Sequence, residues 1–422
     1  MRKSTQGQRE SGELTDPKPR TFPALGHRDF RLYWGGQFVS TAGSQMQMAA
    51  VAWQVYLLTN SAVALGLIGL MRVVPIILLS IFGGVVADVL DRRRLLIITQ
   101  SVLMSLSLLL SIATWSGHVS VWVIYTVTAL AACAISFDNP ARQAMIPSLV
   151  PRAHLTNAIS VNSTTFQLAT MIGPALAGLI IATRGVAAVY ATDAASFCTV
   201  LIALIVIRPP AIVGGIQRVS IGAAVEGLRF MRDSPIILWT MLLDFVATFC
   251  GSATALLPIF ARQVLAVGSE GYGVLYAAPA GGAIVAGALM SIFGSRIRRQ
   301  GITILVAVTA YGLCTVLFGL SRIYLISLLA LAGTGAADTV SMVLRQTVRQ
   351  LNTPDVLRGR MTSVGMMFFM GGPQLGEMEA GAVAGAVGAP LSVIFGGVAA
   401  VVATVIIATR AAGLRRYTGP PR

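Results

Sequence analysis

Long apolar stretches without any charged residue recur along this chain, separated by short polar segments. The segment 95–137 contains no Asp, Glu, Lys or Arg, and the same is true of 32–71. Each is about twice as long as the roughly 20 residues that cross a bilayer as one helix. We therefore expect each to form two membrane spans joined by a tight turn, at Thr59-Asn60-Ser61 and at Ser116-Gly117-His118.

The same pattern predicts an all-α membrane protein with twelve transmembrane helices in two pseudo-symmetric six-helix halves. The expected spans are 32–58, 64–88, 94–115, 119–138, 157–182, 186–207, 236–260, 271–293, 302–320, 323–346, 361–386 and 389–411. The halves are 32–208 and 236–412, and a basic cytoplasmic linker with Pro and Gly pairs, 209–235, joins them. A disordered cytoplasmic tail, 1–31, and a short cytoplasmic tail, 413–422, complete the expected organisation.

Composition excludes a soluble protein, because only 11% of the residues are charged and 55% are hydrophobic, against about 25% charged in soluble domains. The 31 Lys and Arg residues are distributed very unevenly over the predicted loops. Only Arg184, Arg262 and Arg322 fall on one side, Arg72 lies within a span, and the others share the side of both termini. The positive-inside rule then places both termini in the cytoplasm of a cell with an inner membrane. The net charge of +15 is thus a topology signal that also attracts anionic lipid, and no nucleic-acid partner is expected.

Two short motifs repeat between the halves. Arg142-Gln143 lies nine residues before Pro151, and Arg345-Gln346 lies nine residues before Pro354. Gly-Pro-x-Leu occurs at 173–176 and again at 372–375. Parallel halves of this kind are a transporter architecture in which the substrate site lies between the repeats. The alternative is that Gly and Pro are simply common in membrane helices.

The chain lacks the residues that most enzymes and pumps need. Its only lysines, Lys3 and Lys18, lie in the N-terminal tail, so no phosphate-binding loop of the Walker type is present. The four cysteines stand singly in apolar segments and only three histidines occur, so we expect no metal and no cofactor. The chain is not expected to be an enzyme, and an ion gradient is the remaining energy source.

Ionisable residues inside the membrane are costly and are therefore functional candidates. Asp244 belongs to a stripe with Thr240, Thr248 and Ser252, and Asp338 lies in the tenth span. We expect these two acids to carry protons, because burial favours the neutral form of a carboxyl group. The alternative for each is a structural hydrogen bond, and this is favoured for Asp193 in the sixth span.

A second polar stripe, on the first helix, is expected to line the same cavity. It consists of Gln37, Thr41, Ser44 and Gln47, which share one helical face.

Arg72 and Glu377 are expected to pair. They lie eight and nine residues from the outer ends of the second and eleventh spans, which places both about 12–14 Å deep. Glu379 points about 200° away from Glu377 around the helix, so both acids cannot face Arg72.

The loop after the second span resembles the signature of the major facilitator superfamily, in which a Gly precedes an Asp by four residues and a basic cluster follows. Here these residues are Gly84, Asp88, Arg92 and Arg93, with Val89 and Asp91 departing from the usual pattern. The resemblance implies that they form a cytoplasmic gate of ion pairs that close in one state and separate in another. The alternative is a solvated basic turn that only fixes topology.

Other motifs narrow the resemblance to the branch that contains enterobactin exporters and macrolide or multidrug efflux proteins. They are Asn139-Pro140-Ala141-Arg142-Gln143, Pro147-Ser148-Leu149-Val150-Pro151, Gly273-Val274-Leu275-Tyr276-Ala277-Ala278 and Leu357-Arg358-Gly359-Arg360. The resemblance also implies that helices 1, 4, 7 and 10 line the cavity. Gly173, Pro174 and Gly178 in the fifth span are similar to a helix-packing motif associated with export, with the eighth helix as the facing surface.

The resulting expectation is a monomeric, proton-coupled exporter of a small amphipathic molecule, a siderophore or a hydrophobic drug such as a macrolide, that works by alternating access. An importer or lipid facilitator of the same fold is the first alternative. A non-transporting receptor or scaffold is the second, although it would not require buried carboxylates. A membrane enzyme is disfavoured, because no catalytic constellation of residues is present.

Overall fold

The computed structural model describes residues 23–207, 229–354 and 358–418, with all side chains except those of residues 80–89, 295 and 358–370. This part of the chain is helical, as expected where lipid leaves backbone groups no partner outside their own helix. The first half contains η1 (Pro23–Gly26), α1 (Arg28–Thr59), α2 (Ala62–Val89), α3 (Arg92–Trp115), α4 (Val121–Leu149), η2 (Arg152–His154), α5 (Leu155–Arg184) and α6 (Val186–Val206). The second contains α8 (Pro235–Cys250), η3 (Ala253–Leu256), α9 (Leu257–Ile259), η4 (Phe260–Val264), α10 (Gly268–Phe293), η5 (Gly294–Arg296), α11 (Gln300–Leu320), α12 (Tyr324–Asn352), α13 (Arg358–Val387), α14 (Ala389–Arg410) and α15 (Ala412–Arg415).

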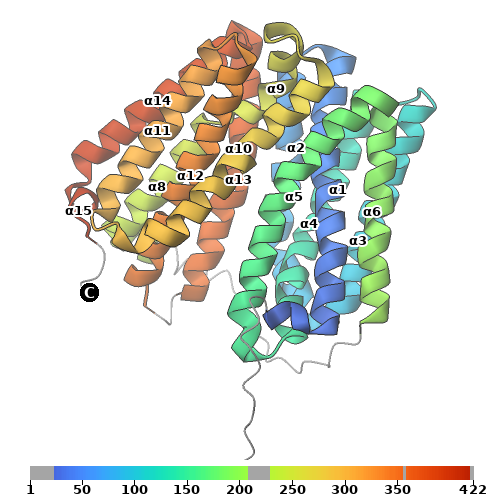
Figure 1. The fold of residues 1–422 in the computed structure, drawn as a ribbon, viewed down its shortest axis with the longest axis horizontal. Helices are drawn as coiled ribbons and strands as arrows, with labels where there is room; N and C mark the ends of the chain where they lie inside the picture. The colour runs from blue at the N-terminus through green and yellow to red at the C-terminus, as the bar shows by residue number, and fades with distance from the viewer. Residues whose placement is uncertain (1–22, 208–228, 355–357, 419–422) are drawn as a thin grey trace, which may run out of the picture.

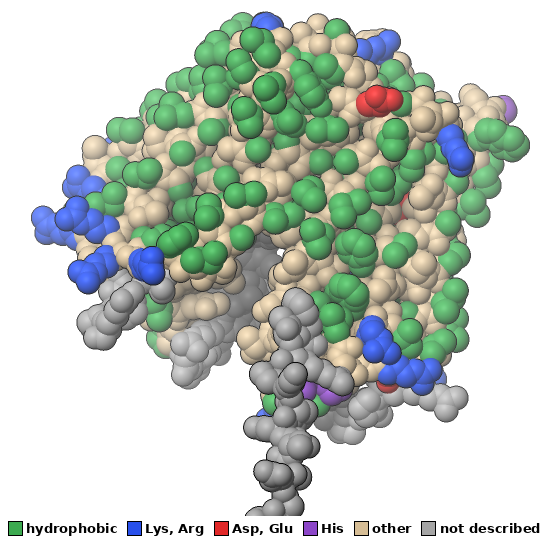
Figure 2. Space-filling view, in the orientation of Figure 1, with side chains coloured by type: hydrophobic (Ala, Val, Ile, Leu, Met, Phe, Trp, Pro, Cys, Tyr) green, Lys and Arg blue, Asp and Glu red, His purple; other side chains and the backbone are tan. Residues whose placement is uncertain are grey.

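The twelve predicted spans agree with these helices. Within the described residues, ten helical segments are long and apolar enough to cross a membrane. The long helices α1 and α13 pack among them and bring the number to twelve. Large apolar side chains such as Leu78, Ile292 and Leu329 lie exposed on the outer surface, and Figure 2 shows this apolar surface with Lys and Arg gathered mainly at one end.

Two helices differ from the prediction. The fourth span was expected to end at Asp138, but α4 continues to Leu149 with Pro140 and Pro147 inside it. Membrane helices tolerate proline where neighbouring groups satisfy the freed carbonyls. The seventh span, expected to be continuous over 236–260, breaks after Cys250, where Gly251 and Ser252 lie between α8 and η3.

The two halves form separate bundles that touch at one end of the molecule (Figure 1). We call the end that carries η1 and α15 the terminal face and the opposite end the far face. Contacts between the halves run from α2 to α13, from α5 to α10, and from α1 to α9 and α10. Towards the terminal face the bundles diverge, and Figure 2 shows a hollow between them there.

Glycines bring the halves into backbone contact near the far face. A Cβ on Gly178 of α5 would collide with the carbonyl oxygen of Ser269 and would lie 2.9 Å from Gly273 Cα on α10. Between α2 and α13, a Cβ on Gly66 would lie 3.0 Å from Gly381 Cα. Small residues allow this close approach of membrane helices, so the far face is closed by tightly packed backbone.

The fifth helix meets the eighth at a different place from the one predicted. Gly173 of α5 faces α1 and not α10, since a Cβ there would lie 2.7 Å from Ala42 O and from Gln45 Cβ. The surface of α10 that meets α5 is centred on Gly273. Gly282, further along the same helix, packs against Ala332 of α12 and not against α5.

A substitution tests the far-face contact. Gly273→Ala is expected to lower the Tm of the full-length chain, because overpacking a tight contact costs about 1–3 kcal/mol. Gly281→Ala on the same helix is the matched control, since a Cβ there would meet only Met171 Sδ, at 3.9 Å. Both changes gain the same helix propensity. Equal Tm values for the two variants would contradict the tight contact.

Candidate functional site

A buried cluster of three charged side chains links α8 to α12 in the second half. Arg345 Nη2 lies 2.7 Å from Asp244 Oδ1 and 3.5 Å from Asp338 Oδ1. The side chain of Arg345 is 1% exposed, that of Asp244 is 9% exposed and that of Asp338 is 39% exposed. The structure therefore brings the two expected proton carriers together around one guanidinium group.

Arg345 is incompletely satisfied in this arrangement. Its Nε and Nη1 are buried and have no hydrogen-bond partner among the described residues. A buried charge is tolerated only with close counter-charges and hydrogen bonds, so the two carboxylates are what keeps this guanidinium in the interior. One positive and two negative side chains give the cluster a formal charge of −1 when both acids are ionised.

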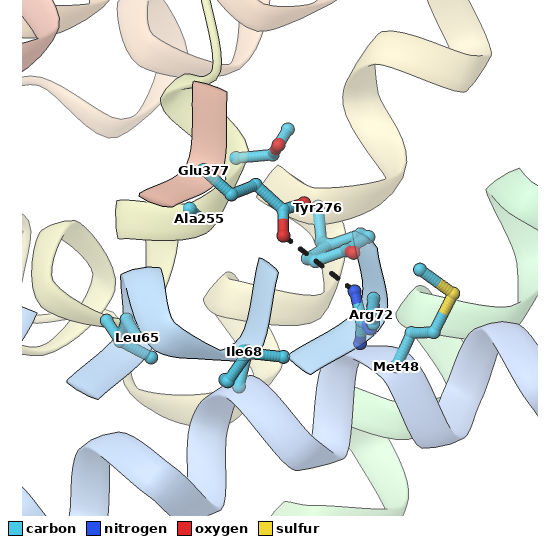
Figure 3. Close-up of a pocket in the computed structure, with 9 residues that line it drawn as sticks. Met48, Leu65, Ile68, Arg72, Ala255, Tyr276 and Glu377 are labelled. Carbon is cyan, nitrogen blue, oxygen red and sulfur yellow. Dashed lines mark ion pairs between the residues drawn. The ribbon is translucent and has the colours of Figure 1, made fainter. Parts of the chain in front are cut away.

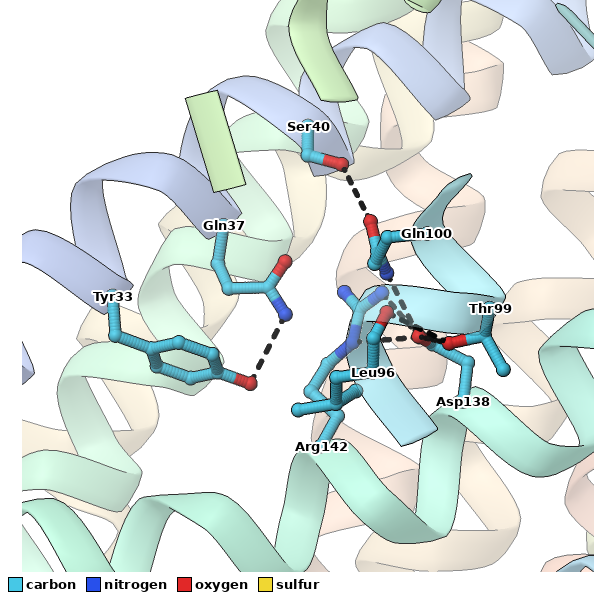
Figure 4. A network of polar contacts seen from close by, with 8 residues as sticks. All are labelled: Tyr33, Gln37, Ser40, Leu96, Thr99, Gln100, Asp138 and Arg142. Atoms are coloured by element: carbon cyan, nitrogen blue, oxygen red, sulfur yellow. Dashed lines mark hydrogen bonds and ion pairs between the residues drawn. The ribbon is translucent and has the colours of Figure 1, made fainter. Parts of the chain in front are cut away.

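The first half contains a second arginine inside the bundle, half-buried and held by a different set of groups (Figure 4). Arg142 on α4 pairs with Asp138 one turn earlier, with Nη2 2.5 Å and Nε 3.1 Å from Asp138 Oδ2. The other carboxylate oxygen accepts from Thr99 Oγ1 and Gln100 Nε2, both at 2.8 Å. Both oxygens of Asp138 are thus satisfied, and the pair is electrically neutral.

Gln37 of the predicted stripe on the first helix belongs to this cluster. With its amide oxygen turned towards α4, that oxygen lies 3.0 Å from Arg142 Nε and 3.2 Å from the hydroxyl of Tyr33. The contact joins α1 to α4, two of the helices expected to line the cavity.

Arg142 and Arg345 occupy equivalent places in the two halves, and sequence reasoning missed both as site residues. They belong to the repeated Arg-Gln motifs, each nine residues before a proline. Both were counted as cytoplasmic charges, Arg142 in the loop after the fourth span and Arg345 at the end of the tenth. The structure places both well inside helices, since α4 runs to Leu149 and α12 to Asn352. The signal was available, because an arginine repeated at the same distance from the same proline in both halves is more than a loop charge.

The expected ion pair between Arg72 and Glu377 is present where α2 meets α13 (Figure 3). Arg72 Nη1 lies 3.9 Å from Glu377 Oε2, and both side chains are mostly buried. They line a cavity of about 20 Å³ together with Met48, Ile68 and Tyr276, which is room for one water molecule. The pair therefore bridges the halves next to the closed far face.

The other predicted stripe residues have mainly local contacts. Gln47 Nε2 donates to Ser107 Oγ of α3 at 3.0 Å, so it faces its own bundle, while Thr41 and Ser44 are half-buried. Along the Asp244 stripe, Thr248 Oγ1 donates to Asp244 O at 2.9 Å and Ser252 Oγ to Thr248 O at 2.7 Å. These hydroxyl groups satisfy their own helix and do not extend the charged cluster.

Asp193 belongs to a separate polar seam between α1, α3 and α6. Its Oδ2 accepts from Ser107 Oγ at 2.6 Å. Three contacts join α1 to α3 at heptad spacing: Ser40 with Gln100, Gln47 with Ser107, and Gln54 with Thr114. The regular spacing indicates that the seam holds the first bundle together.

The expected cytoplasmic gate is only partly visible. The side chains of Gly84 and Asp88 lie outside the described residues. Arg92 Nη1 donates to Ala144 O at 3.1 Å, and Arg93 Nη2 donates to Ile205 O at 2.8 Å. Both arginines therefore contact their own half in this conformation.

Comparison with known proteins identifies the family. The family model for transmembrane secretion effectors, a branch of the major facilitator superfamily, matches residues 20–416. The chain belongs to this family. It is therefore a membrane transporter with the major facilitator fold, and not an enzyme.

Curated relatives of this transporter cover most of its length. The enterobactin exporter EntS of Citrobacter koseri is 27% identical over 399 residues, which span 94% of each chain. EntS of Shigella boydii is 28% identical over 342 residues, 80% of this chain and 81% of that protein.

Solved structures share the fold at low identity. A POT family transporter in complex with 5-aminolevulinic acid has a TM-score of 0.76 at 11% identity, covering 92% of this chain and 97% of that one. A bacterial homolog of the human lysosomal transporter Spinster, inward-facing and unoccupied, has a TM-score of 0.70 at 15% identity, covering 94% and 97%.

Charge reversal tests the bridge between Arg72 and Glu377. Arg72→Glu or Glu377→Arg alone is expected to lower the Tm and to block transport, because each places like charges together in a medium of low dielectric. The double variant should recover part of both. The measurements are the Tm of the purified chain and transport by cells that express it.

Glu270→Arg provides the control, since Glu270 is exposed in the first turn of α10. The ion pair would be shown to have no role if the single reversals left Tm and transport unchanged. The same would follow if the double variant had no higher Tm and no more transport than either single variant.

Proposed function

We propose that this transporter is a proton-coupled exporter of a small amphipathic molecule of the siderophore class, working by alternating access. The observation that carries the proposal is a charged cluster with an unbalanced negative charge, placed in a protein that is closed at one face and hollow at the other. Transport driven by an ion gradient requires two halves that can move against each other, a gate between them and an ionisable site, and this molecule has all three.

The proposal takes the terminal face as the cytoplasmic one. Lys and Arg are concentrated in loops on that side, which the positive-inside rule assigns to the cytoplasm. The hollow then opens inward. In support, the structural neighbours include the Spinster homolog in an inward-facing conformation and a ferroportin homologue in an inward-facing state.

The substrate class rests on the curated relatives, which are exporters of enterobactin and align over 80–94% of this chain. The family description, a secretion effector, agrees with outward movement. Gly84, Asp88, Arg92 and Arg93 remain the proposed cytoplasmic gate. In the outward-open state, Arg92 and Arg93 would exchange their present carbonyl partners for groups on the other half.

Coupling is assigned to the cluster of Asp244, Asp338 and Arg345. Ionisable groups inside the membrane are expensive and are retained where a transport cycle uses them. A cluster that alternates between charges of 0 and −1 provides a site for one proton. Arg142 and Asp138 are already neutral and satisfied, so we assign them to the structure of the cavity wall.

An efflux assay tests the proposal. Cells that express the chain should accumulate less enterobactin than cells without it, and a protonophore should abolish the difference because it removes the gradient. Asp244→Asn and Asp338→Asn should each lose gradient-driven efflux.

Glu270→Gln is the matched control, because Glu270 is an exposed acid in the first turn of α10. Greater accumulation in expressing cells would indicate an importer, and efflux that persists with the protonophore would exclude proton coupling.

A further inference from the structure

We propose that, within the cluster of Asp244, Asp338 and Arg345, the proton is carried by Asp338, and that Arg345 and Asp244 are positioning residues. This inference rests on the proposed proton coupling and says which acid takes the proton and what the proton changes. It assigns to Arg345 the role of a cation shared between two competing carboxylates.

The two acids compete for the same atom. Asp244 Oδ1 and Asp338 Oδ1 both approach Arg345 Nη2, at 2.7 Å and 3.5 Å. Arg345 is the cation in ion-pair contact with both carboxylates, and the positive charge of Arg349 acts on Asp244. One guanidinium group cannot fully compensate two ionised carboxylates, so one of the acids holds a proton in the neutral form of the cluster. The shorter contact identifies Asp244 as the ionised partner of Arg345.

The exposed fraction of the side chain also favours Asp338 as the proton carrier, since it is 39% for Asp338 and 9% for Asp244. We infer that this exposed part faces the interior hollow and not lipid. Leu325 and Leu329, which are 60% and 63% exposed, mark the lipid-facing side of α12, and Asp338 lies about 180–220° round the helix from them. Water in the hollow can therefore exchange protons with Asp338.

The other charged and titratable groups around Asp338 do not replace Arg345 or Asp244. On α11 the neighbouring titratable group is Tyr311, whose hydroxyl donates to Gly251 O at 2.9 Å. The stretch of α10 that packs on this part of α12, residues 279–288, contains only Pro, Ala, Gly, Ile and Val. Arg349 lies one turn beyond Arg345 on α12 and contributes positive charge near Asp244.

The proton state of Asp338 controls how firmly α8 is tied to α12. When a hydronium ion in the hollow gives its proton to an Asp338 oxygen, an O–H bond forms, water is left behind, and Arg345 pairs with Asp244 alone. When Asp338 returns the proton to water, its carboxylate competes for Nη2 and weakens the tie between the helices. Asp338 and Arg345 are seven residues apart on one helix, within about 20° of the same direction, so the competition needs no rearrangement of α12.

Thermal unfolding of the purified full-length chain, measured from weakly acidic to weakly alkaline buffer, tests the assignment without any substrate. The wild-type Tm should fall as the pH rises, because the cluster gains an uncompensated negative charge. Asp338→Asn should match the wild type in acidic buffer and lose the share of this fall that Asp338 contributes, so it should exceed the wild type in alkaline buffer. Asp244→Asn should lie below the wild type in acidic buffer, because Arg345 loses its 2.7 Å partner.

Two further variants control the experiment. Glu270→Gln removes an exposed acid of α10 and should keep the wild-type pH dependence. Arg345→Gln should steepen the fall with pH, and adding Asp244→Asn should restore part of the lost Tm, since removing both partners of a buried pair costs less than removing one. If Asp244→Asn does not fold, the comparison of Asp338→Asn with Glu270→Gln still decides the assignment.

The assignment is overturned if Asp338→Asn lies below the wild type in acidic buffer or keeps the wild-type fall with pH. A second measurement in proteoliposomes separates it from the proposed function. Asp338→Asn should move enterobactin down its own gradient at a rate that a pH gradient does not change. If wild-type transport also ignores the pH gradient, the proposed coupling fails, whereas the thermal measurements still decide which acid holds the proton.

Discussion

The cost of placing a charge in a poorly solvated interior is the constraint on which the arrangement of this molecule depends. A charged side chain at the centre of a bilayer costs about 2.5–3.5 kcal/mol even by insertion scales that allow relaxation. Each of the three arginines at depth has an acid within ion-pair distance: Arg72 with Glu377, Arg142 with Asp138, and Arg345 with Asp244 and Asp338. Two of these pairs join different helices, α2 to α13 and α8 to α12. Arg142 and Asp138 lie on one helix, and Asp138 ties α4 to α3 through Thr99 and Gln100.

Because the two halves are repeats, a difference between equivalent sites indicates a difference in their roles. Arg142 and Arg345 occupy corresponding positions, yet their surroundings differ in charge and in satisfaction. Both oxygens of Asp138 are hydrogen-bonded, and Gln37 lies within reach of Arg142. Arg345 keeps two nitrogens without a partner in the described part of the chain and faces two acids. A fully satisfied buried network rigidifies its surroundings, whereas unpaired buried groups are costly. This difference is why the proposal assigns the cavity wall to the first half and the proton-responsive group to the second.

Sequence reasoning predicted the helices and one ion pair because both depend on simple periodic rules. Hydropathy gave the twelve spans, and helical rise gave matching depths to Arg72 and Glu377, which the structure places 3.9 Å apart. It missed the partner of Asp244 because Arg345, at the end of the predicted tenth span, was counted as a solvated cytoplasmic charge. Charge counting cannot distinguish a buried cation near a helix end from a solvated one. It also missed the break after Cys250, which depends on tertiary packing around Gly251, where a Cβ would collide with Tyr311. Gln37 and Gln47 were predicted to line one cavity from the same face of α1. In the structure Gln37 lies within reach of Arg142 on α4, whereas Gln47 donates to Ser107 on α3.

The proposed proton site and the closed face are separate in space, so the proposed transport cycle must connect them through packed helices. Asp338 lies three residues from Gly335, and a Cβ on Gly335 would collide with the carbonyl oxygen of Pro279 on α10. Six residues before Pro279 along α10, Gly273 packs against Gly178 of α5 at the far face. Backbone contacts without intervening side chains leave no compressible layer, so a movement of α12 is passed to α10 and from there to the contact between the halves. In the proposed mechanism, the ion pair between α8 and α12 therefore lies where a single proton would bias both the charged cluster and the closed face.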